Sequence, residues 1–416
     1  MVLNVFKNTV LFFLLVFISC GNNTNKNLNS NNDILNQVQN DKEIIVGANQ
    51  TEAYLPLLNG KRVGIVANQT SVIFKDGRQM TDDRSYTHLV DSIVNLNVNV
   101  KKVFSPEHGF RGTADAGEHV EDGVDIKTGL PIFSLHGKSK KPSKEQLEDI
   151  DIMIFDIQDV GVRFYTYIST LHYIMEVCAE NNIPLIILDR PNPNGSYIDG
   201  PTLEKEHQSF LGMHPIPLVH GMTIGEYAQM INGEKWLSNG IQCDITVISC
   251  KNYNHDMPYS LPIRPSPNLP NDQSIKLYPS LGLFEGTNIN AGRGTEFQFQ
   301  RYGAPFLNPE TMTFTYTPQS NFGAKYPKHK DELCYGEDLS NVTIDREMTL
   351  KWIMKAYENS TDKSKFFLTN GFTKHAGTTA LQKQIEAGIT EGEIKATWQK
   401  DLNAFKKTRN NYLIYN

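Results

Sequence analysis

The stretch Ile152-Met-Ile-Phe-Asp-Ile157, followed by Gln158-Asp-Val-Gly161 and by a helical run over residues 169–181, decides the fold. A short apolar run bounded by a polar turn indicates a buried strand. The apolar positions Leu171, Ile174, Met175 and Cys178 then recur at helical spacing. The sequence therefore predicts a strand–turn–helix unit here, with Cys178 in the core.

Similar apolar, β-branched runs recur through the first half of the chain, at residues 62–67, 98–104 and 184–188. Strands that alternate with helices predict a Rossmann-like α/β domain built on a largely parallel sheet. Polar, Gly-rich or Pro-rich segments follow the four strands, at residues 68–70, 105–109, 158–161 and 189–193. In a parallel sheet such loops share the carboxyl edge, so we expect all four to line one crevice.

The second half is less regular and predicts a smaller, mixed α/β domain. A strand is expected at residues 311–316, with helices near 350–357, 378–387 and 391–405. Thr223 and Glu226 form a capping-box pattern that opens a helix through Met230. We place the boundary near residue 250, which gives domains of residues 43–250 and 251–416.

The N-terminus has the layout of a bacterial lipoprotein signal: Lys7, an apolar run over residues 10–18, then Ser19 and Cys20. The run is too short to span a bilayer, so residues 1–20 predict export and lipidation at Cys20. The Asn-rich residues 21–42 predict a flexible tether. The alternative is an ordinary signal peptide in which Cys20 is incidental.

Composition excludes several classes of function. A net charge of -6 and a pI near 6.0 argue against a nucleic-acid partner, because such proteins carry basic surfaces. Cys178, Cys243, Cys250 and Cys334 form no CxxC pair and no disulfide framework. No GxSxG, HExxH or phosphate-loop pattern is present. We expect no cofactor and no metal, although a metal site assembled from His108, Asp156 and other residues stays open as an alternative.

The strongest local signal is Phe104-Ser-Pro-Glu-His-Gly-Phe110, which places a carboxylate and an imidazole just past a strand end. A partly desolvated Glu can donate a proton near neutral pH, so Glu107 is the first candidate for a catalytic acid. His108 beside it is a candidate for substrate binding. The alternative is that Glu107 caps a helix or pairs with Arg111.

Two further clusters follow the next strands. Asp156, Asp159, Arg163 and Tyr165 crowd the passage after the third strand, and this density of polar and aromatic groups suits a carbohydrate. Asp159 could instead cap a helix, and the tyrosines could be ordinary half-buried residues. After the fourth strand, Asn192 is a candidate reader of sugar hydroxyls, while Asp189 and Arg190 could form a local salt bridge.

A fourth cluster is Glu285-Gly-Thr-Asn-Ile-Asn-Ala-Gly-Arg-Gly-Thr-Glu296. It offers Glu285, Asn288 and Arg293 as substrate-binding candidates, and Arg293 could hold a carboxylate with two parallel hydrogen bonds. The alternative is a glycine-rich turn stabilised by its own side chains.

Taken together, eight segments in one order resemble the exo-β-N-acetylmuramidase (NamZ-type) family along nearly the whole mature chain. They are Gly64-Ile-Val-Ala-Asn-Gln-Thr70, residues 104–112, Thr128-Gly-Leu-Pro131, residues 155–170, Leu188-Asp-Arg-Pro-Asn-Pro193, His220-Gly-Met-Thr-Ile-Gly-Glu226, Pro265-Ser-Pro-Asn268, and residues 285–288 with 292–295. The resemblance implies a Rossmann-like catalytic domain, a C-terminal domain that completes the substrate cleft, and Glu107 as the catalytic glutamate. It also implies release of N-acetylmuramic acid from the non-reducing end of peptidoglycan fragments, and with the signal a periplasmic, lipid-anchored location in the cell envelope.

Glycosidases usually use one carboxyl group as acid and a second group as nucleophile or base. The second group is open between Asp156, Asp159, Glu285 and the 2-acetamido group of the substrate. The lactyl carboxylate of the sugar is assigned to Arg163 or Arg293. Two rival functions remain: a non-catalytic lipoprotein that binds cell-wall sugars or muropeptides, and a metal-dependent amidase or deacetylase.

Overall fold

The computed structural model describes residues 43–75, 86–112, 122–137 and 139–415. Residues Ile44–Asn416 form one compact unit. The predicted signal peptide, Cys20 and the Asn-rich tether lie outside the described residues.

The larger part of this unit is built on a seven-stranded sheet with the order β5-β6-β4-β1-β7-β8-β9. Its strands, in chain order, are β1 (Val63–Ala67), β4 (Val100–Ser105), β5 (Gly123–Val124), β6 (Pro131–Ser134), β7 (Ile152–Asp156), β8 (Leu185–Leu188) and β9 (Ile245–Ile248). All neighbours pair in parallel except the edge strand β5, which is antiparallel to β6. The predicted α/β class and largely parallel sheet are confirmed.

The six parallel strands follow the order of a doubly wound nucleotide-binding fold, 3-2-1-4-5-6 along the chain. The direction of winding reverses between β1 and β7, which lie side by side. Ligands of such sheets bind beyond the carboxyl ends of the strands near this reversal. The fold itself therefore points to the segments that follow β1, β4 and β7.

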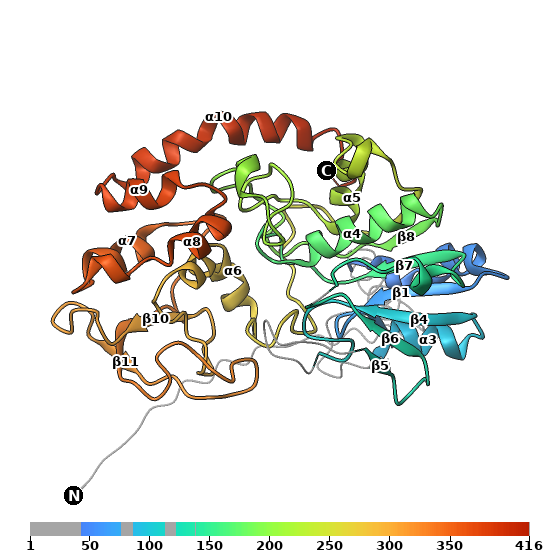
Figure 1. Cartoon of the computed structure of the whole chain (residues 1–416), viewed down its shortest axis with the longest axis horizontal. Coiled ribbons are helices and arrows are strands. Elements are labelled where there is room, and N and C mark those ends of the chain that lie inside the picture. The colour runs from blue at the N-terminus through green and yellow to red at the C-terminus, as the bar shows by residue number, and fades with distance from the viewer. Residues whose placement is uncertain (1–42, 76–85, 113–121, 138, 416) are drawn as a thin grey trace, which may run out of the picture. The chain divides into compact units, whose positions relative to one another are not determined.

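Each face of the sheet is covered by its own layer, because successive strand residues point to opposite faces. Met153 and Phe155 of β7 pack into the core shared with α4 (Tyr167–Glu180) and α5 (Ile224–Gly233). Ile152 and Ile154 pack instead into the core that contains α3 (Leu89–Asn95). Figure 1 shows α4 and α5 together along one side of the sheet.

The strands predicted at residues 62–67, 98–104, 152–157 and 184–188 correspond to β1, β4, β7 and β8, with ends that differ by one or two residues. Helix α4 starts two residues before its predicted start. The predicted capping box is present: Thr223 accepts from the Glu226 amide, and Glu226 accepts from the Thr223 amide. Cys178 is fully buried in the core, as expected.

The C-terminal part combines a small antiparallel sheet with helices α6 to α10 (Figure 1). The sheet has the order β10-β12-β11, with β10 (Arg301–Ala304), β11 (Phe314–Tyr316) and β12 (Cys334–Asp338). The helices are α6 (Asp272–Leu281), α7 (Lys351–Glu358), α8 (Thr369–Ala376), α9 (Ala380–Glu386) and α10 (Glu391–Arg409). Their apolar faces join the same core as α4 and α5, which explains why the two parts form one compact unit.

Besides short 3-10 helices, the remaining described elements are the short helix α2 (Thr51–Tyr54) and the antiparallel pair of β2 (Val72–Phe74) and β3 (Tyr86–His88). Within the described ranges, no helix has both the length and the apolar character needed to cross a membrane. The four described cysteines are buried and unpaired.

Candidate active site

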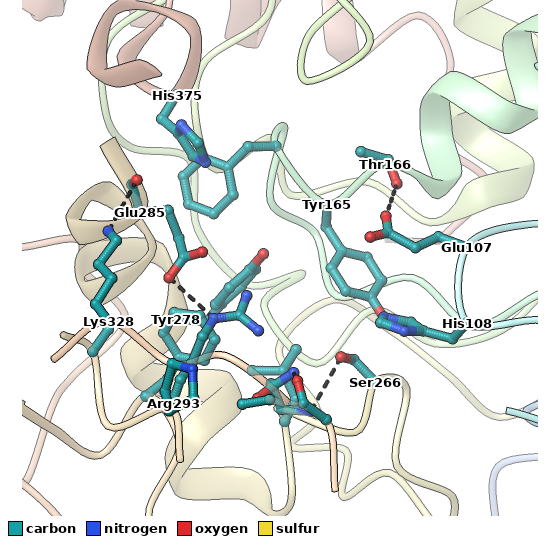
Figure 2. Close-up of a pocket in the computed structure, with 18 of the residues that line it drawn as sticks. Glu107, His108, Tyr165, Thr166, Ser266, Tyr278, Glu285, Arg293, Lys328 and His375 are labelled. Carbon is teal, nitrogen blue, oxygen red and sulfur yellow. Dashed lines mark hydrogen bonds and ion pairs between the residues drawn. The ribbon is translucent and has the colours of Figure 1, made fainter. Parts of the chain in front are cut away.

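A cavity of about 740 Å³ opens between the carboxyl edge of the sheet and the C-terminal part. Its volume falls in the range of small-ligand sites. The sheet side contributes Glu107 and His108 after β4, and residues 164–167 at the start of α4. The opposite side comes from residues 266–299, 323–328 and His375. Figure 2 shows Glu107 on one side and Glu285 with Arg293 on the other.

Glu107 lies just past the end of β4, beside the first turn of α4. Its Oε2 accepts a hydrogen bond of 3.1 Å from the Thr166 hydroxyl, and its backbone carbonyl lies 3.4 Å from the Tyr167 hydroxyl. The side chain is half-buried and faces the cavity (Figure 2). The alternative pairing with Arg111 is wrong, because the Arg111 guanidinium binds Asp91 and Asp125.

The turn that presents Glu107 is unusual in its backbone. His108 and Gly109 both adopt positive φ, at 72° and 78°. This conformation is uncommon for a residue with a Cβ atom, and such residues concentrate at functional sites. His108 is buried and lines the cavity next to Glu107, and its predicted role in substrate binding stays a prediction.

Aromatic rings form much of the cavity wall. Tyr165 lies against Tyr167 and Tyr278 in edge-on contacts, with ring centroids 4.8 and 6.0 Å apart. The Tyr165 hydroxyl donates to the Pro265 carbonyl at 2.7 Å, which fixes the ring. Tyr278 also packs on Phe164 at 5.2 Å. Such rings present apolar faces for the C–H face of a sugar, while hydroxyl groups remain at their edges.

Glu285 and Arg293 form an ion pair across the glycine-rich segment, with Arg293 Nε 3.1 Å from Glu285 Oε1. Burial raises the pKa of Glu285, but the positive charges of Arg293 and Lys328 outweigh it and hold the pKa at about 2. Glu285 is therefore ionised at neutral pH. The other Arg293 nitrogens turn toward the cavity (Figure 2).

Lys328 lines the cavity, but its ammonium group forms hydrogen bonds with backbone carbonyls. It donates to the carbonyls of Phe284 (2.9 Å), Glu285 (3.2 Å) and Thr287 (2.6 Å). Asn268 similarly binds the Gly323 carbonyl at 2.7 Å and so fixes the segment over residues 323–328. These contacts shape the wall around Glu285.

Of the residues predicted for the site, the structure brings together Glu107, His108, Tyr165, Glu285 and Arg293. Asp156, Asp159, Arg163, Asn192 and Asn288 do not line this cavity. The expectation that all four loops line one crevice is also wrong. Residues 68–70 and 189–193 do not line the cavity and instead form hydrogen bonds with the neighbouring loops. For example, Thr70 Oγ1 accepts from the Gln158 amide at 3.0 Å.

Asp156 is held in a buried ion pair rather than in the cavity. Arg190 Nε lies 2.6 Å from Asp156 Oδ1, and Arg190 Nη2 lies 2.9 Å from Oδ2. The alternative of a local salt bridge between Asp189 and Arg190 is therefore wrong as well; Asp189 accepts from the Thr223 hydroxyl and the Gly225 amide. Asp156 also joins no group of metal-capable side chains among the residues that the structure describes.

Asn192 is also part of the framework. Its amide donates to the Met222 carbonyl at 2.9 Å and accepts from the Asn194 amide at 2.8 Å. Its side chain packs directly on Gly161, where an added Cβ atom would lie only 2.4 Å away. Asn288 binds the Lys365 carbonyl. Neither side chain is placed to read a sugar in this cavity.

Arg163 is the largest correction to the predicted site. Its side chain is fully buried, and its guanidinium donates to the carbonyls of Pro201 (2.7 Å), Ile216 (2.8 Å), His375 (3.0 Å) and Ala376 (2.7 Å). Both Nη atoms, which a substrate carboxylate would need, are already used, and Nε is buried without a partner. Arg163 joins the segment after β7 to the end of α8.

Asp159 binds the Gly161 amide at 2.7 Å from a fully enclosed position. Burial raises the pKa of its carboxyl to about 7, despite the lowering effect of the Gly161 and Val160 amides. His220 Nε2 lies 3.7 Å from the same carboxyl oxygen. Asp159 thus stabilises a turn near the winding reversal, and it titrates in the physiological range.

Sequence reasoning missed several wall residues: Thr166, Ser266, Asn268, Tyr278, Phe299, Tyr326, Lys328 and His375. Ser266 and Asn268 stand in a segment quoted only for the family resemblance. Lys328 and His375 come from stretches with no motif, so only the fold brings them to the cavity. Elsewhere in the described ranges, Glu204, Glu206 and His207 form one cluster of metal-capable side chains, and it lies outside the cavity wall.

The fold and cavity define an α/β protein with two opposed carboxylates and aromatic walls at the carboxyl edge of a doubly wound sheet. Models of the N-terminal and C-terminal parts of exo-beta-N-acetylmuramidase NamZ match residues 63–273 and 276–415. The chain therefore belongs to the exo-beta-N-acetylmuramidase NamZ family.

Similarities to individual proteins support the same family assignment. The chain is 41% identical over 381 residues to the peptidoglycan beta-N-acetylmuramidase NamZ of Bacillus subtilis (strain 168), covering 87% of this chain and 89% of the relative. It also resembles crystal structures of two DUF1343 family proteins from Bacteroides fragilis NCTC 9343. One has a TM-score of 0.80 at 45% identity and covers 90% of this chain and 99% of that one. The other has a TM-score of 0.74 at 29% identity and covers 90% and 100%.

The pKa of Asp159 makes a prediction for stability. The folded state keeps its proton up to about pH 7, whereas an unfolded Asp loses it near pH 4. The wild-type protein therefore loses stability as pH rises from about 4 to 7. Asp159→Asn removes this loss, so the variant should gain roughly 2 kcal/mol relative to wild type between pH 5 and pH 8.

Thermal unfolding at pH 5 and pH 8 measures this difference. Asp151→Asn is the matched control, because Arg62 holds the pKa of Asp151 at about 2. Its contribution is fully present at both pH values, so that variant should differ from wild type by the same amount at each. A pH-independent difference for Asp159→Asn would contradict the buried-carboxyl account.

Proposed function

We propose that this protein is an exo-acting glycoside hydrolase that releases N-acetylmuramic acid from the non-reducing end of peptidoglycan fragments during cell-wall turnover. One observation carries the proposal: Glu107 faces an ionised Glu285 across an aromatic-walled cavity. Two carboxyl groups around one sugar are what glycoside hydrolysis usually requires. The peptidoglycan muramidase named above is a relative over most of the chain.

Glu107 acts as the general acid in this proposal. Its carboxyl group is half-buried and contacts the Thr166 hydroxyl, which leaves it in reach of a ligand in the cavity. Glu285 is ionised at neutral pH and paired with Arg293, so it has no proton to donate. The proton that the leaving sugar oxygen needs therefore comes from Glu107.

The second catalytic group is Glu285 or the 2-acetamido group of the substrate. Asp156 and Asp159 drop out, because both are bound within the framework behind the cavity wall. A carboxylate with a pKa of about 2 needs no deprotonation before it attacks or activates water. If the acetamido group attacks instead, Glu285 keeps the role of orienting Arg293.

Arg293 recognises the lactyl carboxylate of N-acetylmuramic acid. Arg293 is favoured over Arg163, because four backbone carbonyls occupy the Nη atoms of Arg163 and its side chain does not line the cavity. Arg293 uses Nε for Glu285 and presents its other nitrogens to the cavity. A partly buried guanidinium suits a carboxylate, because it offers two parallel hydrogen bonds together with opposite charge.

The rival function, a non-catalytic receptor for cell-wall sugars, would use the same aromatic walls. The Bacillus subtilis relative is named as an enzyme, which favours hydrolysis. The metal-dependent amidase has weaker support, because the metal-capable cluster of the described residues lies outside the cavity wall.

We also propose that Cys20 carries a lipid that holds the mature protein to a membrane on the periplasmic side of the cell envelope. The support is the order of residues 7–20: a positive charge, a short apolar run, then Ser19 and Cys20. The Asn-rich residues 21–42 would let the enzyme reach glycan away from the membrane.

Glu107→Gln should lower kcat on a MurNAc–GlcNAc disaccharide by about 10²- to 10⁴-fold, the usual loss for a general acid. The loss should be clearly smaller on 4-nitrophenyl β-N-acetylmuraminide, whose leaving group departs with little protonation. Substrate affinity should stay close to that of wild type. Glu206→Gln, an exposed carboxyl away from the cavity wall, serves as the control. Equal losses on both substrates would rule out the acid role.

Arg293→Gln should reduce kcat/KM on the muraminide at least about tenfold more than on the matching N-acetylglucosaminide, which lacks the lactyl carboxylate. Arg293→Lys keeps the charge but loses the second parallel hydrogen bond, so its relative loss of kcat/KM on the muraminide should lie between those of wild type and Arg293→Gln. Steady-state kinetics on the two nitrophenyl substrates measures the ratio. Equal losses on both substrates would defeat the assignment.

Cys20→Ser should move the protein from the membrane fraction to the soluble fraction and abolish its metabolic labelling with an alkyne fatty acid. Ser19→Ala, which keeps a small residue before the cysteine, should remain labelled. Labelling of the wild-type protein but not of the Cys20→Ser variant establishes the anchor. An unlabelled wild-type protein would instead indicate an ordinary signal peptide.

A further inference from the structure

His375 reaches the cavity from a part of the chain with no recognisable motif. It lies near the C-terminal end of α8 and lines the cavity on the side away from Glu107 (Figure 2). Its ring packs on Phe164, with centroids 5.4 Å apart. The function proposed above assigns it no role.

One hydrogen bond fixes which ring nitrogen carries the proton. His375 Nδ1 lies 2.9 Å from the Gly371 carbonyl, which can only accept. Nδ1 is therefore the donor, and in the neutral ring Nε2 is an acceptor. Burial lowers the pKa of His375 and outweighs the raising effects of the Gly371 carbonyl and Glu285, so the ring is neutral at pH 7. Nε2 has no hydrogen-bond partner among the residues that the structure describes.

The backbone that carries His375 is fixed from both sides. Arg163 Nη2 donates to the carbonyls of His375 (3.0 Å) and Ala376 (2.7 Å). Gly377 then ends α8 in the left-handed conformation with φ of 78°, and a Cβ atom there would lie 2.5 Å from Arg163 Nη2. The acceptor is thus held in one place before any ligand arrives, which is what selective recognition requires.

We propose that His375 Nε2 accepts a hydrogen bond from the 4-hydroxyl of the terminal sugar and so selects the free non-reducing end. This inference rests on the function proposed above. Glu107 must sit at the glycosidic oxygen on C1, and C4 lies across the pyranose ring from C1. His375 lies across the cavity from Glu107, on the same side as Glu285 (Figure 2). Of the two second catalytic groups left open above, this placement uses the 2-acetamido group, with Glu285 orienting Arg293.

The same contact explains exo action. A terminal sugar offers a 4-hydroxyl whose proton can pair with Nε2. An internal sugar has an ether oxygen at this position, which has no proton to donate and leaves a desolvated acceptor unpaired. Sites built to bind a hydroxyl reject ligands that lack it far more strongly than apolar pockets reject small changes in size.

The test compares 4-nitrophenyl β-N-acetylmuraminide with its 4-deoxy and 6-deoxy analogues, using the whole chain in detergent. Wild type should favour the parent over the 4-deoxy compound by about 10- to 100-fold in kcat/KM. It should show a smaller preference over the 6-deoxy compound. His375→Leu should lose activity on the parent by a similar factor and cleave the parent and 4-deoxy compounds equally well.

Two further variants separate recognition from folding. His375→Gln places an amide oxygen near the position of Nε2 and should restore part of the preference for the 4-hydroxyl. His207→Leu, a histidine outside the cavity wall, should behave like wild type. The inference is overturned if His375→Leu keeps the full preference, or if the preference of wild type follows the 6-hydroxyl. If wild type cleaves no muraminide at all, the proposed function fails instead.

Discussion

The site depends on one buried cation. Arg163 follows the winding reversal of the sheet. Its guanidinium binds four carbonyls in three other places: residue 201, residue 216 and the end of α8. Removing it would take the donor from the carbonyls of Pro201, His375 and Ala376, at about 1–3 kcal/mol each, while the Ile216 carbonyl keeps the bond from the Leu203 amide. Because α8 belongs to the C-terminal part and Arg163 to the sheet part, this cation fixes the distance between the two walls of the cavity.

The polar groups nearest the strand ends form a framework rather than a binding surface. Asp156 directly ends β7 and pairs with Arg190, while Asp159 and Asn192 hold the turn around Gly161. Buried polar groups need partners, and here they find them in the neighbouring loops. The sheet-side groups that face the cavity lie further along the chain after β7, at residues 164–167, or in the left-handed turn after β4.

This layering explains what the sequence could and could not predict. Short apolar, β-branched runs and helical spacing located β1, β4, β7, β8 and α4, because these signals are local. Glu107 was singled out by a similarly local signal, a carboxylate in a Pro–Gly turn just past a strand end, and the structure places it on the cavity wall. Arg163 and Asn192 were misassigned because a dense run of polar residues looks the same whether its partners are ligands or backbone carbonyls.

Long-range assembly accounts for the residues that were missed. His375 and Lys328 stand in stretches of ordinary composition, and they reach the wall only through Arg163 and through the carbonyls after residue 283. No local pattern encodes such contacts. Tyr278 was hidden for a related reason, because within α6 an aromatic residue reads as part of a core face until the Tyr165 ring is placed against it.

The two carboxyl groups acquire different roles from their surroundings. The positive charges of Arg293 and Lys328 lower the pKa of Glu285, which keeps its carboxyl group ionised with no proton to donate. Glu107 lies on the opposite side of the cavity and accepts a hydrogen bond from the Thr166 hydroxyl. Enzymes commonly separate acid from base by giving two similar groups unlike environments. The cation cluster at Glu285 therefore does two things at once: it leaves proton donation to Glu107, and it supplies the positive charge that an acidic sugar needs at the far end of the cavity.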